Sequence, residues 1–140
     1  MPRVAVERGA KVLIGGHKVS DTTFAPTVLS DVPEDASVCA DEAFAPLVVL
    51  ARFGRFEDAL AAINRSEFGL QAGVFTSDLE RALRAFDTIE TGGILVNDVP
   101  TYRIDHMPYG GVKASGLGRE GPRYTIEEMT ELRLLVINRP

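Results

Sequence analysis

The sequence predicts an α/β domain built on a doubly wound parallel sheet. Two amphipathic segments, each with an apolar residue every three to four positions, alternate with three short apolar runs of strand length. These runs are apolar at consecutive positions, as in strands that are covered on both faces. Helical connections between such strands give parallel neighbours with right-handed crossovers, and 140 residues are enough for one core.

The N-terminal part of the chain predicts one helix and one strand. Residues 4–13 have the pattern of the tail of a helix that ends at Gly15 and Gly16, and residues 25–29 suit a strand. No N-cap residue stands at the position where a complete helix normally begins.

The central part predicts strand, helix, strand, helix, strand. The first helix covers residues 56–65, with one apolar stripe of Phe56, Ala59, Leu60 and Ile63. The second begins at Ser77, whose spacing to Glu80 matches a capping box, and stops at Gly92 and Gly93. Its stripe is Leu79, Ala82, Leu83 and Phe86. The three apolar runs are residues 47–53, 72–76 and 93–97.

The C-terminal part predicts a short helix over residues 124–129 and a strand over residues 132–137. This strand is apolar on both faces, which a solvent-exposed terminal edge avoids. We therefore expect another surface to cover it.

Composition excludes several classes of function. Fifteen basic against twenty acidic residues leave a net charge of −5, and the basic residues are scattered, so we expect no nucleic acid partner. The longest aliphatic stretch, residues 47–51, is far below the roughly 20 residues of a membrane helix, so we expect no membrane span. Cys39 has no second cysteine to pair with, and with only His17 and His106 beside it no zinc site is predicted. A cytoplasmic location is expected.

The segment that follows the third apolar run is the best candidate for a ligand site. In open α/β sheets, ligands bind beyond the carboxyl ends of the strands, which is where residues 97–109 begin. Arg103 offers a planar fork for an anion, His106 supplies an imidazole that could act as an acid or base, and Tyr102 and Tyr109 are amphipathic. The alternative is a solvated surface loop with a packed tyrosine.

The glycine-rich residues 110–121 contain a formal G-x-G-x-x-G at Gly116, Gly118 and Gly121. We reject a dinucleotide fingerprint because a long loop, not a strand, precedes these glycines. Lys113 and Ser115 are also misplaced for a phosphate-binding loop. Tight turns and close backbone packing explain the glycines better. A third feature is residues 41–46, where Glu42 and Phe44 taken alone suit a solvated carboxylate and a core ring.

Taken together and in this order, these features resemble the C-terminal part of the aldehyde dehydrogenase superfamily, over essentially the whole chain. The resemblance implies an aldehyde-dehydrogenase-like α/β fold at residues 1–129 and an oligomerisation strand at residues 130–140. The matching segments are Gly9–Gly16, Phe24–Leu29, Glu42–Pro46 (with Ala45 replacing glycine), Phe68–Thr76, Gly92–Asn97 and Pro108–Gly121.

The resemblance also implies a reaction and the residues that take part. Family members oxidise an aldehyde to the acid through a cysteine thioester, with NAD or NADP as hydride acceptor. Glu42 then corresponds to the residue that binds the nicotinamide ribose hydroxyls, and Phe44 to the ring that contacts the nicotinamide. Residues 99–106, including Tyr102, Arg103 and His106, line the aldehyde pocket, and the terminal strand joins a sheet that reaches a neighbouring subunit, implying a homo-oligomer.

The family's nucleophilic cysteine and general base lie upstream of the matched region, so no catalytic residue is assigned here. Cys39 corresponds to an ordinary buried position, and the isolated chain is expected to be inactive. The segment around Arg103 resembles members that oxidise small hydroxylated or anionic aldehydes, and we hypothesise that Arg103 holds the anionic end. Two alternatives stay open: a non-catalytic self-association module on the same scaffold, and an independent nucleotide-binding fold.

Overall fold

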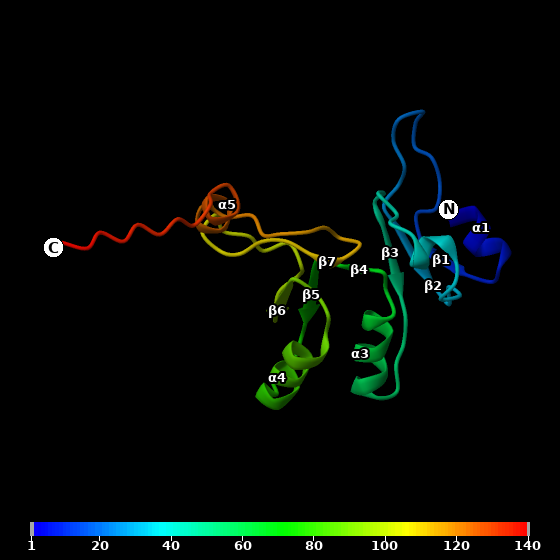
Figure 1. Cartoon of the computed structure of the whole chain (residues 1–140). Helices are drawn as coiled ribbons and strands as arrows, with labels where there is room; N and C mark the ends of the chain where they lie inside the picture. The colour runs from blue at the N-terminus through cyan, green and yellow to red at the C-terminus, as the bar shows by residue number, and fades with distance from the viewer. Residues whose placement is uncertain (1, 140) are drawn as a thin grey trace. The chain divides into compact units, whose positions relative to one another are not determined.

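A computed structural model describes residues 2–139 and divides the chain into two compact units, Met1–Asp58 and Ala59–Pro140. Helices and parallel strand pairs occur in the same chain, which confirms the α/β class (Figure 1). The elements of the first unit are α1 (Pro2–Glu7), β1 (Lys11–Ile14), β2 (Thr27–Ser30), α2 (Ser37–Ala40) and β3 (Leu47–Leu50).

The first unit is organised around a sheet in the order β1-β2-β3. β1 pairs with β2 in antiparallel fashion, and β2 pairs with β3 in parallel from Thr27 opposite Leu47 to Ser30 opposite Leu50. Leu29 on the central strand is 0% exposed and is the largest fully buried side chain among the described residues. Small residues surround it, so this core is compact. They are Ala5, Ala10, Ala36 and Val38.

Thr27 joins three segments of the first unit through one buried residue. Its hydroxyl donates to the Ala25 carbonyl at 2.8 Å and accepts from the Gly16 N–H at 2.9 Å. Its own N–H donates to the Pro46 carbonyl at 2.9 Å. The hydroxyl and the N–H of this buried residue are thereby used, which avoids the cost of an unsatisfied donor.

Two exposed ion pairs lie on the surface of the same unit. Arg8 Nη2 donates to both carboxylate oxygens of Asp35, at 2.7 and 2.8 Å, and Lys11 Nζ lies 2.9 Å from Asp31. The hydrogen bond from each cation lowers the pKa of its aspartate. Exposed pairs of this kind add little to stability because solvent screens them.

The second unit holds two short ladders. β4 pairs antiparallel with β7, and β5 pairs in parallel with β6 from Gln71 opposite Gly93 to Val74 opposite Val96. Helix α3 starts in the first unit and ends in the second. The elements are α3 (Phe56–Asn64), β4 (Phe68–Gly69), β5 (Gln71–Val74), α4 (Leu79–Thr88), β6 (Gly93–Val96), β7 (Val112–Lys113) and α5 (Pro122–Glu128).

Side chains from the end of α3 and from β7 tie the second unit together. Asn64 donates to the Thr88 carbonyl at 2.7 Å and accepts from the Glu90 N–H at 2.9 Å, so it closes the end of α4. The Lys113 ammonium donates to the Asn64 carbonyl at 2.9 Å and lies 3.0 Å from a Glu90 carboxylate oxygen. These contacts join segments that are distant in sequence around the β4–β7 pair.

The predicted helix over residues 4–13 is wrong in its second half. Helix α1 ends at Glu7, Gly9 follows with a φ of +102°, and residues 11–14 form β1. The branched side chains of Val12 and Ile14 suit a strand, and the partner that makes them one is β2, which the local pattern does not show. The strand predicted at residues 25–29 is confirmed, displaced to 27–30.

Helix α4 corrects the predicted capping and the predicted buried stripe. Its N-cap is Asp78, not Ser77, and the Asp78 carboxylate accepts from the backbone N–H groups of Glu80 and Arg81. The helix ends at Thr88, before Gly92. Ala82 and Ala85 are buried, whereas three of the residues expected to face the core are exposed: Leu79, Leu83 and Phe86.

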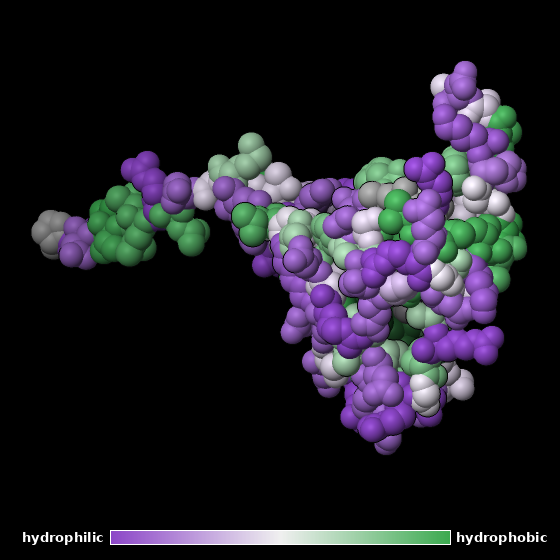
Figure 2. Space-filling view, turned by 90° about the vertical axis from the view of Figure 1, so that its right-hand side faces the viewer, coloured by the Kyte–Doolittle hydropathy of each residue, from purple (hydrophilic) through white to green (hydrophobic). Residues whose placement is uncertain are grey.

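Residues 131–139 form no ladder in the described part of the chain, so the strand expected at 132–137 is not formed here. The apolar side chains from Leu132 to Ile137 are 69–104% exposed and appear as a green stretch in Figure 2. We call residues 132–137 the apolar tail. Among the described residues, no helix has the length and apolarity needed to cross a bilayer.

The burial of Leu29 yields a stability prediction. Leu29→Ala removes the central side chain of a core that is otherwise built from small residues, so it should destabilise the first unit by about 2–5 kcal/mol. Hydrogen exchange of the β2 amides measures this loss. Leu13→Ala, at an exposed position of the same sheet, is the matched control and should leave the exchange rates nearly unchanged; equal acceleration by both variants would contradict the assignment of the core.

Candidate functional site

The candidate site begins where the parallel strands β5 and β6 end. Asn97 follows β6 with a φ of +60°, and its side-chain oxygen accepts from the Thr76 N–H at 2.8 Å. Its own N–H donates to the Val74 carbonyl at 2.8 Å. One asparagine thus joins the carboxyl ends of both strands and directs the following residues outward. Residues 98–108, which we call the site loop, start from this fixed point.

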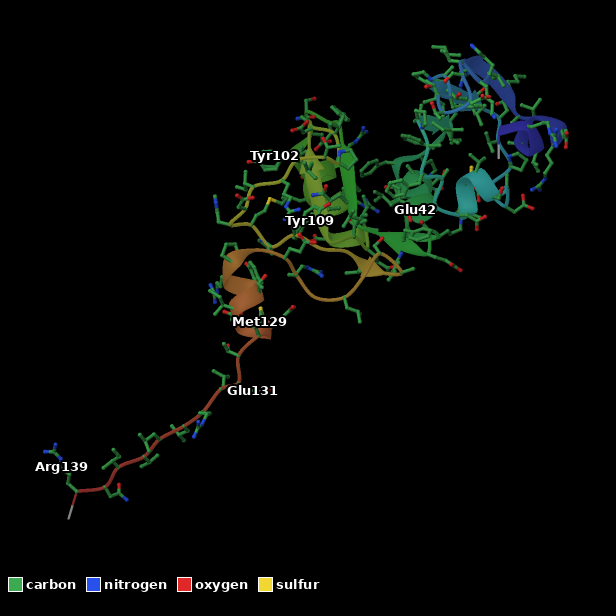
Figure 3. The ribbon with its side chains drawn as sticks, turned by 90° about the horizontal axis from the view of Figure 1, so that it is seen from above. Glu42, Tyr102, Tyr109, Met129, Glu131 and Arg139 are labelled. Atoms are coloured by element: carbon green, nitrogen blue, oxygen red, sulfur yellow. The ribbon has the colours of Figure 1, made fainter. Side chains whose placement is uncertain are left out.

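The site loop is anchored to the sheet and to the glycine segment that follows it. Gln71 on β5 donates from its side chain to the Tyr102 carbonyl at 3.1 Å. Tyr109 and Glu120 form an isolated antiparallel bridge, in which the Tyr109 N–H donates to the Glu120 carbonyl at 3.1 Å. Figure 3 shows Tyr102 and Tyr109 on this stretch of chain. The loop is therefore held at its middle and at its far end.

Arg103 is the one predicted site residue of this loop that takes part in a defined cluster. Its Nη2 donates to a Glu120 carboxylate oxygen at 2.8 Å, and its Cζ lies 4.6 Å from the centre of the Tyr109 ring. The two charged side chains remain 47% and 63% exposed, so a ligand can reach them. Tyr102 and His106 are exposed at neighbouring positions of the loop, His106 in the turn at residues 105–106.

A cavity of about 370 Å³ lies beside this cluster, within the second unit. Tyr109 and Glu120 contribute to its wall, together with the glycine segment and α5. Inside it, Arg119 Nη1 donates to the Gly111 and Gly118 carbonyls at 2.9 and 2.7 Å, and the Glu128 carboxylate accepts from the Arg119 N–H at 3.2 Å. Arg119 therefore organises the segment internally.

The glycines of residues 110–121 serve positive φ angles or close backbone packing, as the sequence predicts. A side chain at Gly92 would collide with the Gly110 carbonyl, and one at Gly110 would approach the Gly118 carbonyl to 2.7 Å. A two-residue strand, β7, and then a turn precede Gly116, so these glycines do not open a helix directly after a long strand. This arrangement agrees with the rejection of a dinucleotide fingerprint.

The predicted cofactor residues lie in the first unit, in the connection between α2 and β3. The Phe44 side chain is 95% exposed and Glu42 is exposed beside it (Figure 3 labels Glu42). Phe44 is therefore not part of the core of the first unit. A bare phenyl ring next to a carboxylate fits a planar group linked to hydroxyls, since the ring offers a face and the carboxylate accepts hydrogen bonds.

Cys39 is exposed on α2, which corrects the expected burial of this residue. The short helix turns the adjacent Val38 into the core and leaves Cys39 outside. Partial desolvation, together with the charge of Glu34, raises the pKa of the thiol. A raised pKa disfavours the thiolate, which is the nucleophilic form, so these surroundings are unlike those of an activated cysteine.

Sequence reasoning missed Glu120. It lies 17 positions after Arg103 between glycines, and no local spacing predicts that the two meet. The available sequence signal was the opposite charge of the two residues, a basic Arg103 in the site loop and an acidic Glu120 in the glycine segment. Within residues 2–139, no three histidine, cysteine or carboxylate side chains gather as a metal site would require.

Comparison with known proteins now identifies the family. The model of the aldehyde dehydrogenase family matches residues 2–135. A 3-sulfolactaldehyde dehydrogenase of Priestia aryabhattai is 51% identical over 134 residues, which are 96% of this chain and 28% of that protein. The chain thus spans about 28% of the length of such a relative.

Solved structures agree with this match. Aldehyde dehydrogenase 21 from Physcomitrella patens, in complex with its reaction product succinate, superposes with a TM-score of 0.93 and 41% identity over 97% of this chain and 28% of that one. Glyceraldehyde-3-phosphate dehydrogenase GapN from Methanocaldococcus jannaschii, complexed with NADP, gives 0.83 and 41% over 89% of this chain and 27% of that one. The chain belongs to the aldehyde dehydrogenase family.

Proposed function

We propose that this chain is the C-terminal portion of an NAD(P)-dependent aldehyde dehydrogenase that oxidises a small anionic or hydroxylated aldehyde to the acid. It contributes part of the cofactor site and one wall of the substrate pocket. The observation that carries the substrate assignment is the exposed Arg103 guanidinium in the loop that leaves the parallel strands. The family match over residues 2–135 supports the reaction class. A cytoplasmic location remains our prediction for the protein.

Glu42 and Phe44 are proposed to hold the nicotinamide half of the cofactor, which accepts the hydride when it is bound. The Glu42 carboxylate accepts hydrogen bonds from ribose hydroxyls, and the exposed Phe44 ring covers a planar group. The Phe44 ring is 95% exposed, so its face is accessible to a planar group. The choice between NAD and NADP is not assigned to either residue.

Arg103 is proposed to bind the anionic end of the substrate. Its fork suits a carboxylate, sulfonate or phosphate, each of which presents two oxygens to parallel N–H donors. The named substrate of the Priestia relative carries a sulfonate, and the product bound to the Physcomitrella enzyme is a dicarboxylate, so both relatives handle anionic compounds. Tyr102 and His106 are proposed to line the same pocket wall.

The isolated 140-residue chain should not oxidise aldehydes, because we assign the nucleophile and the general base to a preceding portion of the protein. Cys39 does not replace them, since its surroundings raise the pKa of the thiol. NAD(P)H formation with several aldehydes, followed by absorbance, should stay at background. Turnover that Cys39→Ser abolishes would overturn this assignment, and tight NAD binding by the chain alone would favour an independent nucleotide-binding fold.

Arg103→Leu should raise KM selectively for an anionic aldehyde. In a protein that joins this chain to the preceding portion of a family member, we expect a roughly tenfold increase for 3-sulfolactaldehyde, since a hydrogen bond to a charged group contributes about 1.5–3 kcal/mol and Arg103 is partly solvated. Lactaldehyde, which is the same aldehyde without the sulfonate group and is neutral, should show little change. Arg123→Leu on α5 is the control, because Arg123 is also exposed and paired with a glutamate. Equal effects on both aldehydes would remove the assignment.

A second candidate function, self-association, is favoured by the apolar tail. Its side chains are largely exposed, and burial of such surface is favourable at about 25 cal/mol per Å². We propose that the tail assembles the protein with a second copy or with a longer relative, as a strand in a shared sheet.

Sedimentation of the isolated chain at low micromolar concentration tests this assembly. The unsubstituted chain should form oligomers, and Leu134→Asp combined with Val136→Asp should give monomers because two charges would enter the buried face. Glu131→Lys, a charge change directly before the apolar tail, should leave the oligomers intact. A clean monomer for the unsubstituted chain would count against a role of the tail in assembly.

A further inference from the structure

The guanidinium of Arg103 is held from two directions by groups that belong to one backbone bridge. The Glu120 carboxylate accepts from Nη2 at 2.8 Å, and the Tyr109 ring lies under the guanidinium with 4.6 Å between Cζ and the ring centre. Tyr109 and Glu120 are themselves paired: the Tyr109 N–H donates to the Glu120 carbonyl at 3.1 Å and the Glu120 N–H to the Tyr109 carbonyl at 2.6 Å. The backbone positions that carry the carboxylate and the ring are therefore fixed relative to each other.

This fixed pair contrasts with the loop that carries Arg103. Residues 102–104 have no helix or strand, so the loop alone does not set the rotamers of a long side chain. The bridge is close-packed against the loop, since a side chain at Gly121 would lie 2.8 Å from the Met107 carbonyl. The orientation of the Arg103 guanidinium is thus imposed from outside its own loop.

A guanidinium carries five N–H donors, and the recorded contact with Glu120 uses one side of it. The group stays about half exposed, so its other edge can receive two oxygens of an anion. A fork already held in place loses less rotamer freedom when the anion binds. The negative charge of Glu120 acts in the opposite sense, because it reduces the net attraction for an anion.

We propose that Glu120 is a positioning residue for recognition of an anionic substrate: together with Tyr109 it holds Arg103 so that the free edge of the guanidinium faces the ligand. This inference rests on the proposed role of Arg103 as the anion-binding residue. It assigns to the glycine segment a part in specificity in addition to its packing. The accepting oxygen at position 120 supplies the positioning, and the charge that comes with it weakens binding.

The test uses the whole 140-residue chain and two small probes. The backbone amide NMR signals of the site loop, which every variant retains, are followed during titration with sodium isethionate, a hydroxylated sulfonate, at constant ionic strength, and with 1,2-propanediol as the neutral probe. Glu120→Ala should raise the Kd for isethionate about fivefold, because ordering one long side chain costs roughly two- to tenfold in affinity. Glu120→Gln keeps an accepting oxygen without the charge and should bind at least as tightly as the unsubstituted chain.

Two controls make the outcome decisive. Glu127→Ala removes the carboxylate of the Arg123–Glu127 pair, an exposed ion pair of similar length at 2.9 Å, and should leave the Kd unchanged. Arg103→Leu should abolish isethionate binding. If it does while Glu120→Ala binds normally, the positioning role is overturned and the role of Arg103 stands. If Glu120→Gln is as weak as Glu120→Ala, charge rather than position matters and the inference fails. If Arg103→Leu binds normally, both assignments fall.

Discussion

The second unit depends on backbone segments approaching each other with no side chain between them. Gly92 lies against the Gly110 carbonyl, and Gly110 lies against the Gly118 carbonyl at a distance that a Cβ would reduce to 2.7 Å. Only glycine has the room for such contacts. They bring the end of the glycine segment back beside its start, which is what sets Tyr109 opposite Glu120. The clustering of Arg103 with these residues follows from that closure.

The fold class and the position of the candidate site were predictable because they depend on local signals. The apolar runs predicted at 47–53, 72–76 and 93–97 form strands at 47–50, 71–74 and 93–96, and residues 97–109 leave the last of them as expected. The glycine segment was also interpreted correctly, since the requirement for a strand directly before a nucleotide-binding turn is a local one. Arg103 was predicted as a site residue from the chemistry of its side chain alone.

The errors concern features that depend on distant partners. The local sequence pattern of residues 11–14 fits a helix tail, but in the structure these residues form a strand because they pair with β2. Asp78, one position after the predicted Ser77, caps α4 because its carboxylate accepts from two backbone N–H groups at once. Cys39 was expected to be buried, yet four residues of helix turn Val38 inward in its place. The contact between Arg103 and Glu120 spans 17 positions and requires the whole glycine segment to fold.

Helix α4 divides its apolar residues unequally between its two sides. The inward side carries Ala82 and Ala85, whose small side chains let the helix axis come close to the sheet but remove little surface from water. The outward side carries Leu79, Leu83 and Phe86, spaced at four and three positions on one stripe. The larger share of the hydrophobic free energy available to this helix is therefore not realised within the second unit. It would be gained only if another surface excluded water from the stripe, and covering the stripe would then also stabilise the helix.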